Sequence, residues 1–462
     1  MAAGKEASAG LEWRVSAPEG STVTLQPEGG LVSRAWQSSL ALFVSVASRV
    51  SGFGRMLWDM GANDPRKVIH CVKVGLALAL VSLFYYTRPL YDGVGGAAMW
   101  AVMTVVVIFE FTVGGCLYKG VNRAIATLTA GVLAIGVHWI ASKSGDTAEP
   151  IIRSASVFIL ASAATFSRFI PTIKSRFDYG ITIFILTFSL VAVSGYRVDK
   201  LIQLAEQRLS TIAIGIAICF LVAILVFPVW AGDDLHLLTV RNMDKLADSL
   251  EGCVDEYFNK DQAVNEKEVS SQKLQGYKCV LNSKASEDSL ANLAQWEPAH
   301  GRFNFRHPYS QYTKIGAAMR YCAYCVEALN GCINSDIQVP EALKEHLSDA
   351  CLRVSSECSK VLKDCGSSIK SMQRSRIIDF LVGEMKDAVQ ELHDTLKRPS
   401  ATAPFMEALP VITTASLLIE ITARVDGIVS AVDKLATVAN FKADRKPGRV
   451  EPTEEINGLE QV

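Results

Sequence analysis

The chain has 462 residues, of which 50% are hydrophobic, with a mean hydropathy of +0.23 and a formal net charge of −1. This apolar content excludes an ordinary soluble protein, and the balanced charge gives no basis for binding nucleic acid. The stretch 68–230 is apolar, whereas the chain from Asp233 onward is rich in acidic and basic residues. We therefore predict one part in lipid and one part in water.

The first 30 residues are rich in Gly, Ser, Pro and Glu and have no early apolar core, so we expect disorder and no cleaved secretory signal. From Trp36 to Val46, apolar residues recur near helical spacing. That stretch is too short and too rich in Ser to cross a bilayer, which favours a helix on the membrane surface, with a plain tether as the alternative.

Six apolar runs are long enough to predict membrane spans. They are Val68–Tyr86, Ala97–Val113, Ala124–Ile140, Ile151–Phe166, Gly180–Gly195 and Leu209–Trp230. Six spans put both termini on one side, and the distribution of Lys and Arg near the span ends predicts that this side is cytosolic. The turn between the fifth and sixth spans departs from this rule, because Arg197, Lys200 and Arg208 lie on its outer side.

After Trp230 the periodicity is that of soluble helices. Helical patterns cover the stretch from Leu235 to Leu250 and then Tyr309–Asn334, Glu341–Lys370, Arg376–Leu396 and Ala408–Ala439. The predicted fold is an all-α membrane protein with six transmembrane helices followed by a cytosolic helical bundle. Its predicted parts are a disordered N-terminus with an interfacial helix (1–66), the transmembrane domain (67–232), the cytosolic domain (233–440) and a flexible tail (441–462).

Two ionisable residues lie inside the first two predicted spans, where a charge is costly and needs a reason. Lys73 lies between one and two turns inside the first span, and Glu110 lies near the cytosolic end of the second. If these spans are antiparallel neighbours, the two groups reach similar depth and form a structural ion pair. A pore-lining Lys73 is the alternative.

Basic residues crowd the two predicted cytosolic turns that follow the second and fourth spans. Positive-inside topology explains many such clusters, but Arg123 and Arg168 directly adjoin apolar runs. With Arg208 at the outer start of the sixth span, they could supply cations at both ends of an anion pathway. The candidate pore residues are Arg208, Arg123, Lys119, Arg168, Arg176 and Lys73.

The cysteines fit core packing better than a metal site. Cys322 and Cys325 form a single CxxC, and Cys351, Cys358 and Cys365 repeat every seven residues on one helix stripe. The sequence contains no nucleotide-binding loop, dinucleotide fingerprint or hydrolase triad, so we predict no enzyme activity, no cofactor and no metal.

Several motifs resemble the plant aluminium-activated malate transporter family. They are the run from Met99 to Phe111, Lys119-Gly-Val-Asn-Arg, the run from Arg176 to Phe188, Pro228-Val-Trp-Ala-Gly-Asp-Asp-Leu, and Trp296-Glu-Pro-Ala-His-Gly. The resemblance covers nearly everything from Asp64 to about Thr437. It implies a plant source and a dimeric anion channel, with malate or related anions as permeants and lipid as its surroundings.

One departure from the family pattern concerns activation by aluminium. The outer turn between the fifth and sixth spans keeps Asp199 beside Lys200, and Asp92 on the first outer turn also matches the family. A hard trivalent cation prefers several carboxylates, so Asp92 and Asp199 form a poor site for sensing an external cation. We expect no strong activation by aluminium.

The expected function is passive conduction of malate and other anions across the plasma membrane or the vacuolar membrane. The turn formed by Trp296, Glu297 and Pro298 is assigned to regulation by the cytosolic bundle, with a plain helix connector as the alternative. A coupled exporter of organic or aromatic acids, similar to bacterial fusaric-acid exporters, is a second possible function. A membrane-anchored scaffold is a third.

Overall fold

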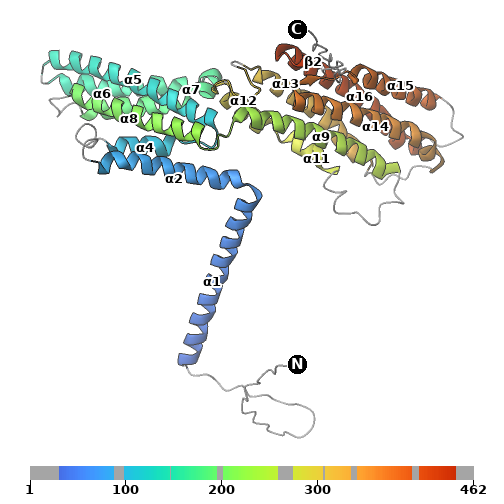
Figure 1. Ribbon diagram of the computed structural model, residues 1–462, viewed down its shortest axis with the longest axis horizontal. Helices are drawn as coiled ribbons and strands as arrows, with labels where there is room; N and C mark the ends of the chain where they lie inside the picture. The colour runs from blue at the N-terminus through green and yellow to red at the C-terminus, as the bar shows by residue number, and fades with distance from the viewer. Residues whose placement is uncertain are drawn as a thin grey trace, which may run out of the picture. The chain divides into compact units, whose positions relative to one another are not determined.

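The computed structural model describes residues 31–87, 98–145, 147–194, 201–258, 274–304, 307–333, 341–397 and 405–443. These residues are almost entirely α-helical (Figure 1). The chain divides into two units, residues 1–71 and residues 72–462, and each is described by itself. The predicted disorder of residues 1–30 and the predicted tail beyond Ala443 lie outside the described residues.

The first unit is dominated by α1 (Leu31–Asn63), which extends well beyond the predicted stretch Trp36–Val46. From Phe43 onward its large apolar side chains are exposed, among them Phe43 and Trp58. The helix ends before Pro65, the first residue of α2 (Pro65–Tyr86), because proline lacks the N–H that a continuing helix requires. The side chain of Asp64 accepts a hydrogen bond from the backbone N–H of Arg66 (3.3 Å), as an N-cap residue does.

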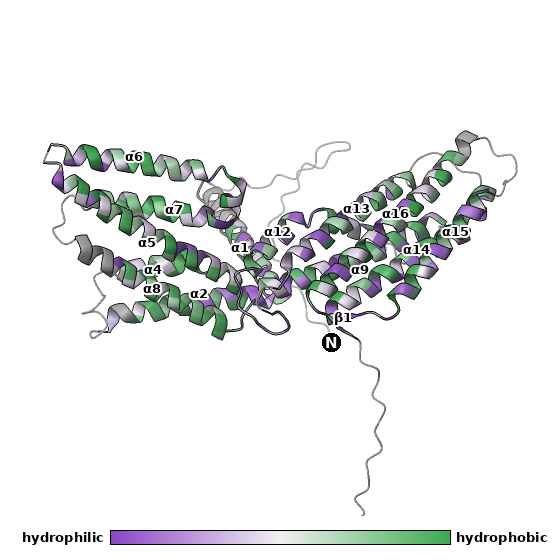
Figure 2. Ribbon diagram, turned by 90° about the horizontal axis from the view of Figure 1, so that it is seen from above, coloured by the Kyte–Doolittle hydropathy of each residue, from purple (hydrophilic) through white to green (hydrophobic). Residues whose placement is uncertain are grey.

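The second unit begins within α2 and continues through the apolar helices α4 (Ala98–Ile108), α5 (Val113–Lys143), α6 (Glu149–Ser167), α7 (Pro171–Ser194) and α8 (Leu201–Leu225). Among the described residues, five stretches are long and apolar enough to cross a membrane: Val113–Lys143, Glu149–Ser167, Pro171–Val193, Arg208–Leu225 and Ala408–Val438. Met99–Ile108 is a shorter apolar helix. The first four stretches correspond to the third to sixth predicted spans, and Figure 2 shows their apolar character.

The second predicted span differs from its expected bounds. The helix ends at Ile108, residues 109–112 are not helical, and α5 begins at Val113. The Thr112 side chain caps α5 by accepting a hydrogen bond from the backbone N–H of Gly115 (3.1 Å). The cytosolic turn predicted between the second and third spans, residues 114–123, is therefore wrong, because this cap starts a helix that runs through these residues.

Two apolar clusters hold the membrane helices together. One joins α2, α4, α5 and α8 around residues such as Val81 and Val105, and the other joins α5, α6 and α7 around Ala130 and Phe188. Between α5 and α8, a Cβ added at Gly120 would lie 2.7 Å from the ring of Phe220. Close packing of these two helices therefore requires glycine at position 120.

The remaining helices form a bundle with a core of its own. They are α9 (Ala231–Phe258), α11 (Gly276–Leu281), α12 (Lys284–Ala294), α13 (Tyr309–Ile333), α14 (Glu341–Ser371), α15 (Ile378–Lys397) and α16 (Phe405–Val438). Two short strands, β1 (Gln373–Arg374) and β2 (Lys442–Ala443), pair in parallel. The predicted helical patterns are confirmed within the described residues, whereas α11, α12 and the two strands lie outside those patterns.

The apolar stretch of α16 belongs to this bundle. It packs against α13 and α14, and Leu418 and Ile421 are fully buried in the bundle core. Cys351, Cys358 and Cys365 of α14 and Cys322 of α13 are buried in the same core. The interpretation of the cysteines as core residues is thus confirmed, and the hydropathy of α16 reflects its packing within the bundle.

A buried charged contact ties α12 to α13. Glu287 is 1% exposed, and its carboxylate accepts hydrogen bonds from Ser283 and from the guanidinium of Arg320, each at 2.6 Å. A Cβ added at Gly316 would lie 2.0 Å from this carboxylate. The ion pair therefore needs a glycine on the facing side of α13, whereas a Cβ at Gly331 of the same helix would meet nothing within 4 Å.

Candidate functional site: a helix joint and buried cations

The Glu297 carboxylate joins the membrane helices to the bundle. Its side chain is fully buried, and it accepts hydrogen bonds from three backbone N–H groups. These are Gly114 (3.3 Å) in the first turn of α5, and Ala231 (2.6 Å) and Gly232 (3.0 Å) in the first turn of α9. Helix N-termini carry partial positive charge and unpaired N–H groups, so one carboxylate caps two helices at once. We call this arrangement the Glu297 joint.

Aromatic rings surround the joint. Trp296 meets the ring of Tyr118 on α5 edge-on, with centroids 5.6 Å apart. The Trp230 ring stacks on His300 at 3.9 Å, and Nδ1 of His300 donates a hydrogen bond to the Pro298 carbonyl (2.9 Å). Trp296 and Glu297 of the predicted turn therefore pack where α5 and α9 begin.

Burial governs the titration of the groups around the joint. It raises the pKa of Glu297, while the three backbone donors and His300 act in the opposite direction. It also lowers the pKa of His307 to about 4, with further lowering by His236 and His300. Because of this lowered pKa, the imidazole of His307 is neutral at neutral pH. His307 and Glu297 line a cavity of about 410 Å³.

Three carboxylates among the described side chains of the membrane helices each have a basic partner. Glu110 pairs with Lys119, and Asp178 binds Arg168 through two contacts, from Nε to Oδ1 at 2.7 Å and from Nη2 to Oδ2 at 3.1 Å. The third carboxylate, Glu149, pairs with Arg153. Lys119 and Arg168, two of the candidate pore cations, are thus compensated by acidic neighbours.

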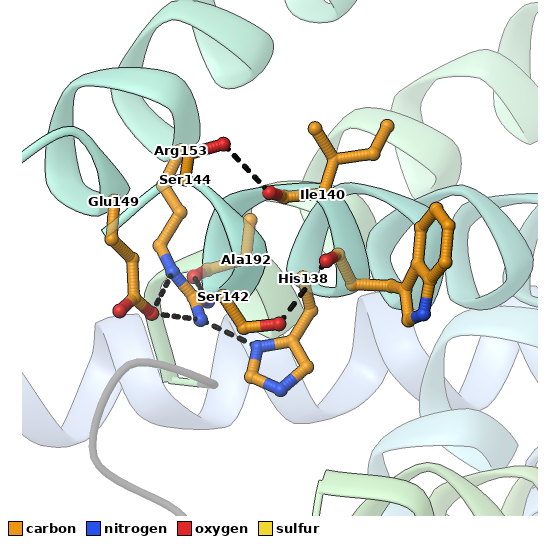
Figure 3. A network of polar contacts seen from close by, with 8 residues as sticks. His138, Ile140, Ser142, Ser144, Glu149, Arg153 and Ala192 are labelled. Carbon is orange, nitrogen blue, oxygen red and sulfur yellow. Dashed lines mark hydrogen bonds and ion pairs between the residues drawn. The ribbon is translucent and has the colours of Figure 1, made fainter. Parts of the chain in front are cut away.

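The Glu149–Arg153 contact belongs to a larger network (Figure 3). The guanidinium of Arg153 is 6% exposed and contacts the Glu149 carboxylate at 2.6 Å, Nδ1 of His138 at 2.5 Å and the Ala192 carbonyl at 3.3 Å. It thereby ties α6 to α5 and α7. Sequence reasoning missed this group, although the i,i+4 spacing of Glu149 and Arg153 could have signalled the pair.

Lys73 and Glu110 have different partners from those expected. Lys73 is 3% exposed, and its Nζ donates a hydrogen bond to the carbonyl of Phe227 (2.8 Å). The partner of Glu110 is Lys119, across the break between α4 and α5. The structure therefore does not bring the expected Lys73–Glu110 pair together.

Arg123 and Arg208 are the two candidate cations whose Nε atoms are buried without a hydrogen-bond partner among the described residues. Arg123 is 6% exposed, and its Nη1 donates to the hydroxyl of Tyr179 at 3.4 Å. Arg208 lies over the ring of Trp100, with its Cζ 4.5 Å from the centroid. Neither guanidinium has a carboxylate partner within the described part of the chain.

The remaining candidate residues are exposed or lie outside the described residues. The Arg176 side chain is exposed, and its carbonyl accepts a hydrogen bond from Asn122 (3.3 Å). Asp92 and Asp199, the candidates for sensing an external cation, lie outside the described residues. Within the described ranges, no cluster of three or more His, Cys, Asp or Glu side chains could hold a metal ion.

Known proteins match most of the chain. The family model described as "Aluminium activated malate transporter" matches residues 58–402. The Arabidopsis thaliana protein "Aluminum-activated malate transporter 10" is 51% identical over 476 aligned residues, covering 94% of this chain and 95% of the relative. The Triticum aestivum protein "Aluminum-activated malate transporter 1" is 46% identical over 411 residues, covering 87% and 89%. The resemblance in the sequence is confirmed, and with its apolar helices this multi-pass membrane protein belongs to the aluminium-activated malate transporter family.

Proposed function

We propose that this protein passively conducts malate and other small anions across a plant membrane. One observation carries the proposal: the described carboxylates of the membrane helices are each paired with a base, while Lys73, Arg123 and Arg208 have no carboxylate partner among the described residues. Buried charge in a membrane is costly and marks an ion pathway. A pathway with excess positive charge attracts anions.

The energetics suit passive release. A malate dianion leaving a compartment at an inside-negative potential gains about 4.6 kcal/mol per 100 mV, twice the value for a unit charge. That energy supports a concentration ratio of about a thousandfold or more, so export needs no coupled ion. The protein supplies cations that attract the anion and still release it.

The arrangement in the membrane follows from the same proposal. α2 and α4 complete a set of six spans, the bundle and both termini lie in the cytosol, and two copies form the channel. Lipid surrounds the spans, and the exposed apolar side chains of α1 rest on the membrane surface. The division between residues 67–232 and 233–440 falls at the Glu297 joint, which we propose transmits the state of the bundle to the pore.

Voltage clamp of oocytes that express the full chain tests the function. We expect malate current that reverses near the malate equilibrium potential, and R123A and R208A should each lower it at least severalfold. R241A changes an exposed arginine of α9 and serves as the control. A reversal potential that follows the proton gradient would support a coupled exporter instead. Malate current unchanged in both R123A and R208A would contradict the assignment of these arginines to the pore.

The same recordings with and without external aluminium test gating. Because Asp92 and Asp199 are few carboxylates beside several cations, we propose that aluminium does not strongly activate this protein. A large increase of current on adding aluminium would refute this part of the proposal.

A further inference from the structure

Thr127 lies one helical turn after Arg123 on α5, and its side chain also has a buried polar atom without a hydrogen-bond partner among the described residues. It is 6% exposed, and its Oγ1 is buried without a hydrogen-bond partner among the described residues. Threonine hydroxyls in helices ordinarily bond to a carbonyl one turn earlier. Thr129 and Thr104 of this protein do so, at 2.9 Å and 2.7 Å. The free hydroxyl of Thr127 is therefore an exception that needs a reason.

Arg123 presents a matching donor edge. Its Nη1 is used by Tyr179, while its Nε has no partner within the described residues. The edge formed by Nε and Nη2 binds carboxylates in a planar, two-point manner. Arg168 uses the same edge on Asp178, with distances of 2.7 Å and 3.1 Å. Arg123 therefore has an unused donor edge of the kind that Arg168 directs to a carboxylate of the chain.

The two residues can serve one ligand. Side chains four positions apart on a helix lie on the same face, with Cβ atoms about 6 Å apart. The Cβ of a helical residue also points toward the N-terminus, so the side chain of Thr127 lies over the turn that carries Arg123. A carboxylate can then accept from the guanidinium with both oxygens and from the hydroxyl with a further lone pair.

We propose that Arg123 and Thr127 form a binding subsite for one carboxylate group of the permeating anion, in which Thr127 favours carboxylates over chloride. This inference rests on the proposed function and adds a selectivity residue to it. A spherical chloride ion cannot use the two-point geometry of the guanidinium edge and the hydroxyl together, so it gains less from the hydroxyl.

Thr127→Val is the appropriate change because it keeps the shape and removes the hydroxyl. The hydroxyl has no partner among the described residues, so its loss costs no hydrogen bond there and should not impair folding. Thr127→Ser keeps the hydroxyl. Thr129→Val removes the hydroxyl of an exposed neighbour on the same helix and is the matched control.

The first measurement is the malate-to-chloride permeability ratio, taken from reversal potentials under bi-ionic conditions. Loss of a hydrogen bond to a charged group predicts a decrease of roughly ten- to hundredfold in T127V. T127S should stay within about twofold of wild type, and T129V should be unchanged. An unaltered ratio in a conducting T127V channel would overturn the subsite and leave the proposed function standing.

The second measurement is calorimetric titration of malate into the full chain in lipid nanodiscs. We expect binding that is roughly ten- to hundredfold weaker in T127V and lost in Arg123→Gln. If the wild type carries no anion current, the proposed function fails and the titration alone decides the subsite. Equal binding by wild type and T127V, or no binding by wild type, would refute it.

Discussion

Replacing Glu297 with glutamine should loosen the first turns of α5 and α9 together. The glutamine oxygen can still accept from Gly114 and Ala231, but the amide nitrogen then occupies the position of Oε2, which accepts from Gly232 at 3.0 Å. A buried N–H then faces another N–H. An orphaned buried donor costs about 1–3 kcal/mol. The lost charge adds little, because the cost of burying the carboxylate offsets its attraction to the helix ends.

Hydrogen–deuterium exchange of the full chain in nanodiscs measures this effect. A cost of about 1–3 kcal/mol corresponds to exchange that is roughly 5- to 150-fold faster in peptides that contain Gly114 and Ala231. Glu287→Gln, which changes the other buried glutamate near this junction, should speed exchange in α12 and α13 and spare these peptides. Unchanged protection of both peptides in E297Q would refute the joint.

Three further outcomes follow from packing and burial. Gly120→Ala should destabilise the membrane helices by about 1–3 kcal/mol through contact between α5 and α8, whereas Gly131→Ala, in open space on the same helix, should be neutral or stabilising in thermal unfolding. Gly316→Ala should cost about 3–5 kcal/mol by displacing the buried Glu287 carboxylate, and Gly331→Ala should lack that loss in the same assay. His307 has its pKa lowered from 6.5 to about 4, so its contribution to stability is fully present above pH 6.5 and is lost as the pH falls toward 4, by about 3 kcal/mol in all. Chemical denaturation at several pH values should show this slope in wild type and a smaller one in His307→Gln.

Patterns that repeat along one helix could be predicted from the sequence. The heptad spacing of Cys351, Cys358 and Cys365 identified a buried stripe, because the helical period alone determines which residues share a face. The Trp296–Glu297–Pro298 turn could be recognised by its composition rather than by a repeat. What the turn contacts depends on two helices more than 60 residues away, which no local pattern encodes.

The contact partners of Lys73 and Glu110 and the break between α4 and α5 could not be predicted from the sequence. Hydropathy is high on both sides of residues 109–112, so an apolar window detects no interruption there. The break places Glu110 beside Lys119, and the approach of α2 to the end of α8 gives Lys73 the carbonyl of Phe227. Both outcomes depend on tertiary geometry. Thr112, an N-cap residue type before Val113, was the one local sign of a helix start.

The length of α5 determines the depth at which an anion would first meet the protein's buried charge. From Arg123 to Lys143 the helix rises about 30 Å at 1.5 Å per residue, which is one hydrocarbon thickness. The Lys143 ammonium lies 4.1 Å from the ring centroid of Trp139, a pairing suited to a headgroup boundary. If that pair marks one boundary, Arg123 lies at the opposite boundary, and the preceding turns of α5 extend beyond the lipid toward the bundle. An anion held at the proposed subsite of Arg123 and Thr127 would then have only just left water, which would put these residues at the entrance of the proposed pathway.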